Sequence, residues 1–223
     1  MSTLQTARLA GLWYFLMAVF GIVGFLIVHP QVYEANDAQA TLLNLQESAG
    51  TARIRLLLEL AIVLSQSLTA VYFYKLFRPI NETAGLSIAL WGTVNAIAVL
   101  VSALAMASAL SVAQSTLAVE SQLLAIEIFS AVIQHAWGLG ALFFGLWLIP
   151  LGYVITSARI MPRSLGQLLM VGGVGYLLSV LLRQAGTASP YLELLTVPAT
   201  VGELWTVGYL LLFGIRTHEV AQG

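Results

Sequence analysis

Long apolar runs separated by short polar gaps dominate the sequence. A membrane-spanning helix needs about 20 mostly apolar residues, and six runs are long enough to meet this requirement. The predicted spans cover approximately residues 8–29, 54–77, 85–111, 129–157, 164–185 and 199–216. Prolines, which interrupt helices, lie beside these runs at Pro30, Pro79, Pro162 and Pro198. The pattern therefore predicts an all-α fold, a polytopic membrane helical bundle with six transmembrane helices, forming a single integral-membrane domain over residues 1–223.

Two of the gaps between the spans have helical patterns of their own. In residues 34–50, Asp37 is a good N-cap, and Ala38, Leu42 and Leu45 share one helical face. This pattern predicts a short amphipathic helix on the membrane surface, on the outer side. Residues 115–128 are also helical in pattern, and they form either a second surface helix or an extension of the fourth span.

Composition supports a membrane protein and excludes several other classes. Apolar residues make up 59% of the 223 residues, and charged residues make up 9%, with 9 basic and 10 acidic side chains. Soluble domains carry roughly 25% charged residues, so a cytosolic enzyme is excluded. A disordered chain and a nucleic-acid partner are excluded as well, because they require low hydrophobicity and a basic surface. The absence of cysteine excludes thiolate metal sites and cysteine nucleophiles.

The distribution of basic residues predicts the orientation. Basic residues concentrate on the cytoplasmic side of membrane proteins. With a cytoplasmic N-terminus, the inside carries Arg8, Lys75, Arg78, Arg159, Arg163 and Arg216, and the outside carries Arg53, Arg55 and Arg183. Six spans then place both termini in the cytoplasm.

A glycine cluster lies within the fifth span. Gly172, Gly173 and Gly175 are embedded in apolar sequence, where small residues permit helices to approach closely. Close helix packing is therefore expected here, rather than a phosphate-binding loop.

Several segments together resemble a known family. They are Arg8-Leu-Ala-Gly-Leu-Trp-Tyr14, Asp37-Ala-x-Ala-Thr41-x-x-Asn44, His135-Ala-Trp-Gly138, Pro162-Arg-x-Leu-Gly166 and Pro198-Ala-x-x-Gly-Glu203. Their order and spacing resemble the bacterial membrane proteins grouped as domain of unknown function 4386. The resemblance covers nearly the whole chain and implies a six-span protein of the bacterial inner membrane. It implies no activity. Glu59 stands where the family has an acidic residue, often Asp, and Arg183 is not part of the family pattern.

Three ionisable residues are expected near the outer ends of different spans. Charged groups inside a bilayer are costly, so each one is a functional hypothesis. Glu59, His135 and Glu203 would converge if the second, fourth and sixth spans were neighbours, and they are our candidate catalytic acid and base groups. Arg55 precedes Glu59 by four residues and can pair with it. Glu203 has no basic residue within one turn, so either its partner comes from another helix or its carboxyl group is protonated.

Further residues on the same side are candidates for ligand binding: Asp37, Arg55, Glu127, Trp137, Arg183 and Trp205. Glu59, His135 and Glu203 are also the ligands that a divalent metal would use, although no recognised metal-ligand spacing is present. No other cofactor is indicated. The partners implied are the lipid bilayer and an apolar small molecule.

Three functions are consistent with this pattern. The first is an outer-leaflet Glu/His pocket that binds or converts a small lipid-like molecule, an isoprenoid or lipid, by acid/base chemistry. The second is a small proton-coupled transporter, and the third is a structural or regulatory subunit without chemistry. Polarity fades toward the inner half after Gln66 and Asn95, which favours a pocket over a transport path. The sequence does not decide whether the protein is an enzyme.

Overall fold

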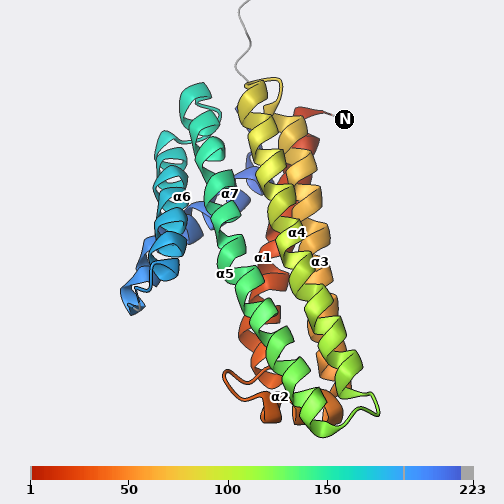
Figure 1. Cartoon of the computed structure of the whole chain (residues 1–223). Helices are drawn as coiled ribbons and strands as arrows, with labels where there is room; N and C mark the ends of the chain where they lie inside the picture. The colour runs from red at the N-terminus through yellow and green to blue at the C-terminus, as the bar shows by residue number, and fades with distance from the viewer. Residues whose placement is uncertain (1, 188, 217–223) are drawn as a thin grey trace, which may run out of the picture. The chain divides into compact units, whose positions relative to one another are not determined.

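The computed structural model describes residues 2–187 and 189–216, and within these residues the chain is helical and contains no strand. Seven α-helices follow one another (Figure 1): α1 (Thr3–Ile22), α2 (Ala38–Glu47), α3 (Ala49–Phe77), α4 (Glu82–Ala113), α5 (Val119–Ala158), α6 (Arg163–Gln184) and α7 (Val197–Leu212). Three short helices complete the described chain: η1 (Val23–Val28), η2 (His29–Gln31) and η3 (Pro190–Thr196).

Within the described residues, six helical segments are long and apolar enough to cross a membrane. They are Thr3–Gln31, Ala49–Phe77, Glu82–Ala113, Val119–Ala158, Arg163–Gln184 and Pro190–Leu212. The predicted all-α, six-span architecture is therefore confirmed. The fourth span begins at Val119 rather than near residue 129. Most of the 115–128 segment thus extends this span and does not form a separate surface helix.

The chain forms two compact units. Unit 1 comprises Met1–Phe15, Gln66–Asn95 and Ala141–Gly223, and unit 2 comprises Leu16–Ser65 and Ala96–Gly140. The helices α1, α3, α4 and α5 each contribute residues to both units. Each unit has its own buried residues and its own polar contacts.

Aromatic packing forms the centre of unit 1. Trp147 is fully buried, with the Tyr14 and Phe73 rings 5.4 and 5.6 Å from its own ring. A Cβ atom on Gly92 would lie 2.8 Å from the Trp147 ring, so a glycine is needed where α4 meets this side chain. A buried hydrogen bond of 2.6 Å from Gln66 Nε2 to Asn95 Oδ1 joins α3 to α4 in the same unit.

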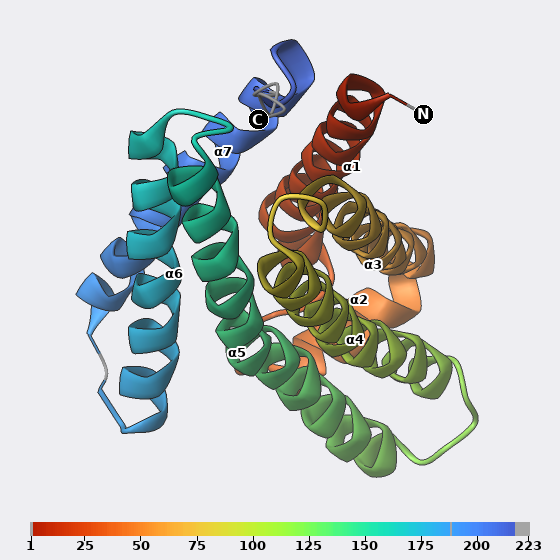
Figure 2. The same cartoon turned by 90° about the horizontal axis from the view of Figure 1, so that it is seen from above.

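The α6 glycines place this helix against two neighbours in unit 1. Helices α6 and α7 lie side by side (Figure 2). A Cβ atom on Gly172 would collide with the backbone of Ala199, and one on Gly175 would collide with the carbonyl of Leu195. Gly173 faces Ile149 of α5 instead. The glycine cluster therefore serves close helix packing, as its apolar context predicted.

The predicted short helix after the first span is α2, in unit 2. The Asp37 carboxylate accepts a 2.8 Å hydrogen bond from the Ala40 backbone N–H, which satisfies one free donor of the first turn. Leu42 and Leu45 are buried in a cluster with Val32, Ala52, Ala109, Ala113 and Ile126. The apolar face of α2 thus packs against α3, α4 and α5 within its own unit.

Candidate functional site

The last turns of the first span depart from the α-helix. Residues Val23–Val28 are π-helical, and the His29 N–H donates to the carbonyl of Gly24, five residues earlier. A 3₁₀ turn containing Pro30 follows directly. Short π-helical segments occur frequently at functional sites. This segment lies where Phe25 and His29 enter the candidate site in unit 2.

Four aromatic side chains form a continuous row in unit 2. The rings of Tyr33 and His29 stack at 5.0 Å, and the rings of His29 and Phe25 lie 5.6 Å apart. Phe25 then meets Trp137 of α5 edge to face at 4.2 Å. We call Phe25, His29, Tyr33 and Trp137 the aromatic row.

The aromatic row lines a cavity of about 910 Å³, which lies wholly within unit 2. Polar side chains also line this cavity: Glu34, Asn36, Asp37, Thr41, Glu127, Ser130 and Gln134. Ligand sites usually have volumes of about 300–1,000 Å³, with aromatic walls and a few placed polar groups. The unit 2 cavity fits this description.

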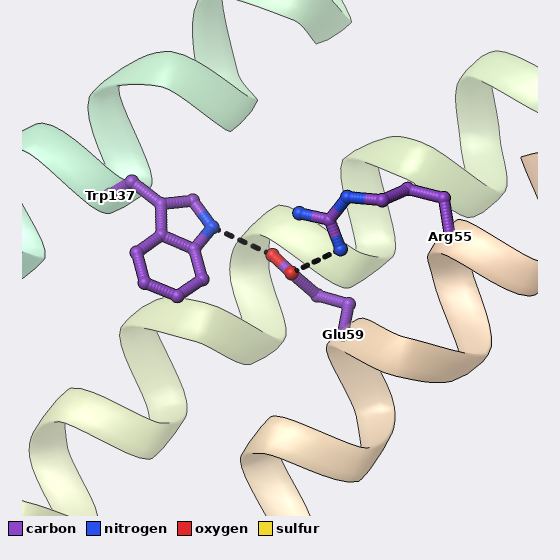
Figure 3. Close-up of polar contacts among 3 residues, drawn as sticks. All are labelled: Arg55, Glu59 and Trp137. Carbon is purple, nitrogen blue, oxygen red and sulfur yellow. Dashed lines mark hydrogen bonds and ion pairs between the residues drawn. The ribbon is translucent and has the colours of Figure 1, made fainter. Parts of the chain in front are cut away.

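A buried ion pair lies next to the aromatic row. Arg55 Nη1 is 2.8 Å from Glu59 Oε2, and neither side chain has exposed surface. Trp137 Nε1 donates a 2.7 Å hydrogen bond to the other Glu59 oxygen, and Figure 3 shows Arg55 and Trp137 directed at Glu59 from two sides. The Arg55 guanidinium also lies over the Phe25 ring, 4.7 Å from its centroid. The predicted Arg55–Glu59 pair is confirmed, and Glu59 is a carboxylate held by two donors.

Some polar atoms near the cavity have no partner. Within the described residues, Arg55 Nε, Arg55 Nη2 and His29 Nδ1 are buried and have no hydrogen-bond partner. Tyr33 borders them from beyond the end of the first span, and burial raises the pKa of its phenol above the ordinary value of 10.0. Tyr33 therefore carries its proton at neutral pH.

Glu203 has a separate environment in unit 1. The Tyr14 hydroxyl donates a 2.5 Å hydrogen bond to Glu203 Oε1, and Tyr14 is only 1% exposed. Among the described residues, no salt bridge involves Glu203. The partner therefore comes from another helix, as expected, but it is a phenol rather than a cation.

The remaining sequence candidates lie in different settings. His135 is exposed on α5, and it precedes Trp137 by two residues, so it points to nearly the opposite side of that helix. Arg183 lies 3.7 Å from Glu193 in an exposed ion pair, and Trp205 is 40% exposed. No group of three His, Asp or Glu side chains among the described residues could hold a metal ion.

The structure thus brings together only some of the predicted site residues. Asp37, Glu127 and Trp137 line the same cavity, while Arg55 and Glu59 adjoin its aromatic row. Sequence reasoning missed Phe25, His29 and Tyr33. Their spacing of four residues at the end of the first span is a signal that could have identified them.

A smaller cavity of about 570 Å³ lies in unit 1. Among the described residues that line it there is no Asp, Glu or His: Asn81, Thr83, Ala84, Ser87, Trp91, Leu146, Ile149, Pro150, Tyr153 and Met170. These lining residues therefore offer no carboxyl or imidazole group for acid/base chemistry. The unit 2 cavity is the stronger candidate site.

Comparisons with known proteins address the family and not the activity. A protein of Archaeoglobus fulgidus described as uncharacterized is 31% identical over 84 residues, which are 38% of this chain and 49% of that protein. The chain thus spans about half the length of this curated relative. No solved structure matches the chain. A family model described as a domain of unknown function matches residues 9–214, so the chain belongs to the family of domain of unknown function 4386.

Proposed function

We propose that this membrane protein binds a small lipid-like molecule, such as an isoprenoid or another lipid, in the unit 2 cavity. One observation carries the proposal: a cavity of about 910 Å³ combines an aromatic wall with carboxylate, amide and hydroxyl groups. An apolar chain would lie along the aromatic row, and a polar end would meet the groups from the 34–41 segment and α5. A pocket with an aromatic wall and a separate polar region is suited to an amphipathic ligand.

The π-helical segment supports the same proposal. It carries Phe25 and leads directly to His29, so it determines how two of the four rings face the cavity. A π-helical turn is a less favourable backbone geometry than an α-helix, and such turns recur at functional sites. The segment is more simply explained by binding than by helix packing alone.

Conversion of the bound molecule by acid/base chemistry is the further part of the proposal. Glu34, Asp37 and Glu127 are the carboxyl groups that line the cavity, so they are the candidates for general acid or base. Glu59 is already held by Arg55 and Trp137. Its role in the proposal is to orient the Trp137 ring through their hydrogen bond. Binding is therefore better supported than catalysis.

We also propose that the protein lies in a bacterial inner membrane with both termini in the cytoplasm. The six basic residues on one side, against three on the other, support this orientation. The segments around 30–37 and 119–127 then belong to the outer side. The unit 2 cavity would therefore take its ligand from the outer leaflet.

The binding proposal can be tested with bromoundecanol, an apolar chain with one hydroxyl and a bromine that quenches tryptophan. The purified protein in nanodiscs should show saturable quenching that disappears in Trp137→Phe. Ala131→Phe fills the cavity wall and should abolish the saturable component, whereas Ala107→Phe, an exposed position on α4 of unit 2, should retain it. Equal, non-saturating quenching in all these variants would contradict the proposal.

A proton-coupled transporter is the second candidate, and the Tyr14–Glu203 contact favours it. This carboxyl group lies within a span, and its hydrogen-bond partner is a phenol rather than a cation. Carboxyl groups in such settings serve as proton relays in transporters. Proteoliposomes with an imposed pH gradient should show proton flux that Glu203→Gln abolishes and that Glu120→Gln, an exposed control, does not change. Equal flux in both variants and in empty vesicles would exclude this role.

A further inference from the structure

We infer that the molecule bound in the unit 2 cavity carries a positively charged headgroup, an ammonium attached to an apolar chain. The inference rests on the proposed function and adds the charge of the ligand to it. Glu34, Asp37 and Glu127 line the cavity, and no arginine or lysine of the described chain does. The lining thus carries an excess of negative charge.

Salt bridges within the described residues do not neutralise this charge. They join Arg55 to Glu59, Arg78 to Glu82 and Arg183 to Glu193. None of them includes a carboxylate that lines the cavity. Within the described residues, none of the three carboxylates is in a salt bridge, and Asp37 alone is used as a helix cap.

Arg55 is the nearest cation, but it does not offset the lining acids. Its guanidinium is fully buried, pairs with Glu59 at 2.8 Å and lies against the Phe25 ring, outside the set of lining residues. Its charge is thus matched by Glu59, which is also outside the set of lining residues.

The aromatic row is the second part of a cation site. Ring faces attract ammonium groups, most strongly for Trp and Tyr, and Trp137 and Tyr33 stand at the two ends of the row. The segment that carries two of the acids is fixed in place. The Glu34 N–H donates to Thr41 Oγ1 at 2.9 Å, and Asp37 caps α2. The segment that carries Glu34 and Asp37 is therefore preorganised beside the aromatic row.

The test compares three probes with the same chain and different headgroups: bromoundecyl trimethylammonium, bromoundecanol and bromoundecanoate. Binding is measured by saturable tryptophan quenching in zwitterionic nanodiscs and corrected for bilayer partitioning with empty nanodiscs. We expect the ammonium probe to bind about tenfold tighter than the alcohol. Added salt should weaken binding of the ammonium probe alone, because it screens exposed charges.

Charge removal identifies the residues responsible. The double variant Glu34→Gln with Glu127→Gln should bind the ammonium probe about fivefold more weakly, which is the scale of two exposed charge interactions. Binding of bromoundecanol, which carries no charge, should weaken less than binding of the ammonium probe, and its remaining saturable component also shows that the double variant is folded. Glu120→Gln on α5, exposed and outside the cavity lining, is the matched control.

The outcomes separate this inference from the proposed function. Saturable binding of all three probes with equal affinity, or tighter binding of the carboxylate, overturns the cation inference and leaves the lipid-binding proposal standing. An ammonium preference that survives in the double variant overturns the assignment of the site to the lining carboxylates. If no probe binds saturably, both proposals fail.

Discussion

At the scale of single residues, the Arg55–Glu59 pair is the most constrained feature of unit 2. Both side chains lack exposed surface, and Trp137 occupies the second carboxylate oxygen. Burying two charges is costly, and their attraction offsets that cost only while both partners remain. The pair is therefore sensitive to the loss of one member and tolerant of the loss of both.

We predict that Arg55→Met destabilises the protein by about 3 kcal/mol, because it leaves Glu59 as an uncompensated buried charge. The free energy of unfolding can be measured by titration with a denaturing detergent. The double variant Arg55→Met with Glu59→Leu should recover most of this loss. A double variant as unstable as the sum of both single variants would show that the pair has a different role.

Tyr33 gives a pH-dependent prediction. Burial raises the pKa of its phenol above 10.0 in the folded protein, so the unfolded chain loses this proton first as the pH rises. The contribution to stability is therefore fully present below pH 10 and is lost above it. Unfolding titrations should show that Tyr33→Phe falls less steeply in stability above pH 10 than the wild type. Identical slopes would show that Tyr33 does not stay protonated in the fold.

At the scale of elements, α6 depends on close contact with its neighbour. A Cβ atom at Gly172 would collide with the Ala199 backbone, which cannot move as a flexible side chain can. Helices in membranes associate largely through such close packing. The close approach of α6 to α7 thus depends on the lack of a side chain at Gly172.

We predict that Gly172→Ala destabilises the protein by about 1–3 kcal/mol, the usual cost of overpacking. Gly208→Ala on α7 is the matched control, because its added Cβ would meet no packing neighbour among the described residues within 4 Å. The control should be neutral or slightly stabilising, since alanine favours helix more than glycine does. Thermal unfolding of both variants in the same detergent measures the difference. Equal stability would show that α6 shifts freely along α7.

Elements with local signals could be predicted from the sequence, and those that depend on neighbours could not. The Asp37 cap and the spacing of Leu42 and Leu45 predicted α2, because a cap and a face are local properties. The start of α5 at Val119 could not be located, since hydropathy reports where apolar sequence begins and not how far a helix continues beyond it. The π-helical turn depends on tertiary contacts and has no comparable local pattern.

The same distinction applies to the candidate site. The Arg55–Glu59 pair follows from a spacing of four residues, so it was predictable. The phenol partner of Glu203 lies far away in the sequence, on α1, and only the need for a partner could be inferred. The aromatic row joins the end of the first span to α5, and a sequence pattern does not state which helices are neighbours.

At the scale of the whole molecule, six spans require both termini to lie on one side of the membrane. The basic residues predict that this side is the cytoplasm. A reporter fused after Gly223 should be active only in the cytoplasm. One inserted after Ser115, in the α4–α5 connection, should be active only outside. Periplasmic activity of the first fusion would reverse the orientation and move the unit 2 cavity to the inner leaflet.

The π-helical turn of Val23–Val28 has a consequence for how this cavity changes between related chains. Its hydrogen bond from His29 to Gly24 encloses one residue more than an α-helical bond would. Deleting one residue between Phe25 and His29 would restore the α-helical bond and reduce their spacing from four residues to three, while the helix before the turn and the chain after it keep their register. The Phe25 and His29 rings would then be offset from each other, which would interrupt the aromatic row at the cavity. A single insertion or deletion in this turn is therefore enough to change what the cavity accepts, with every residue on α2 and α5 unchanged.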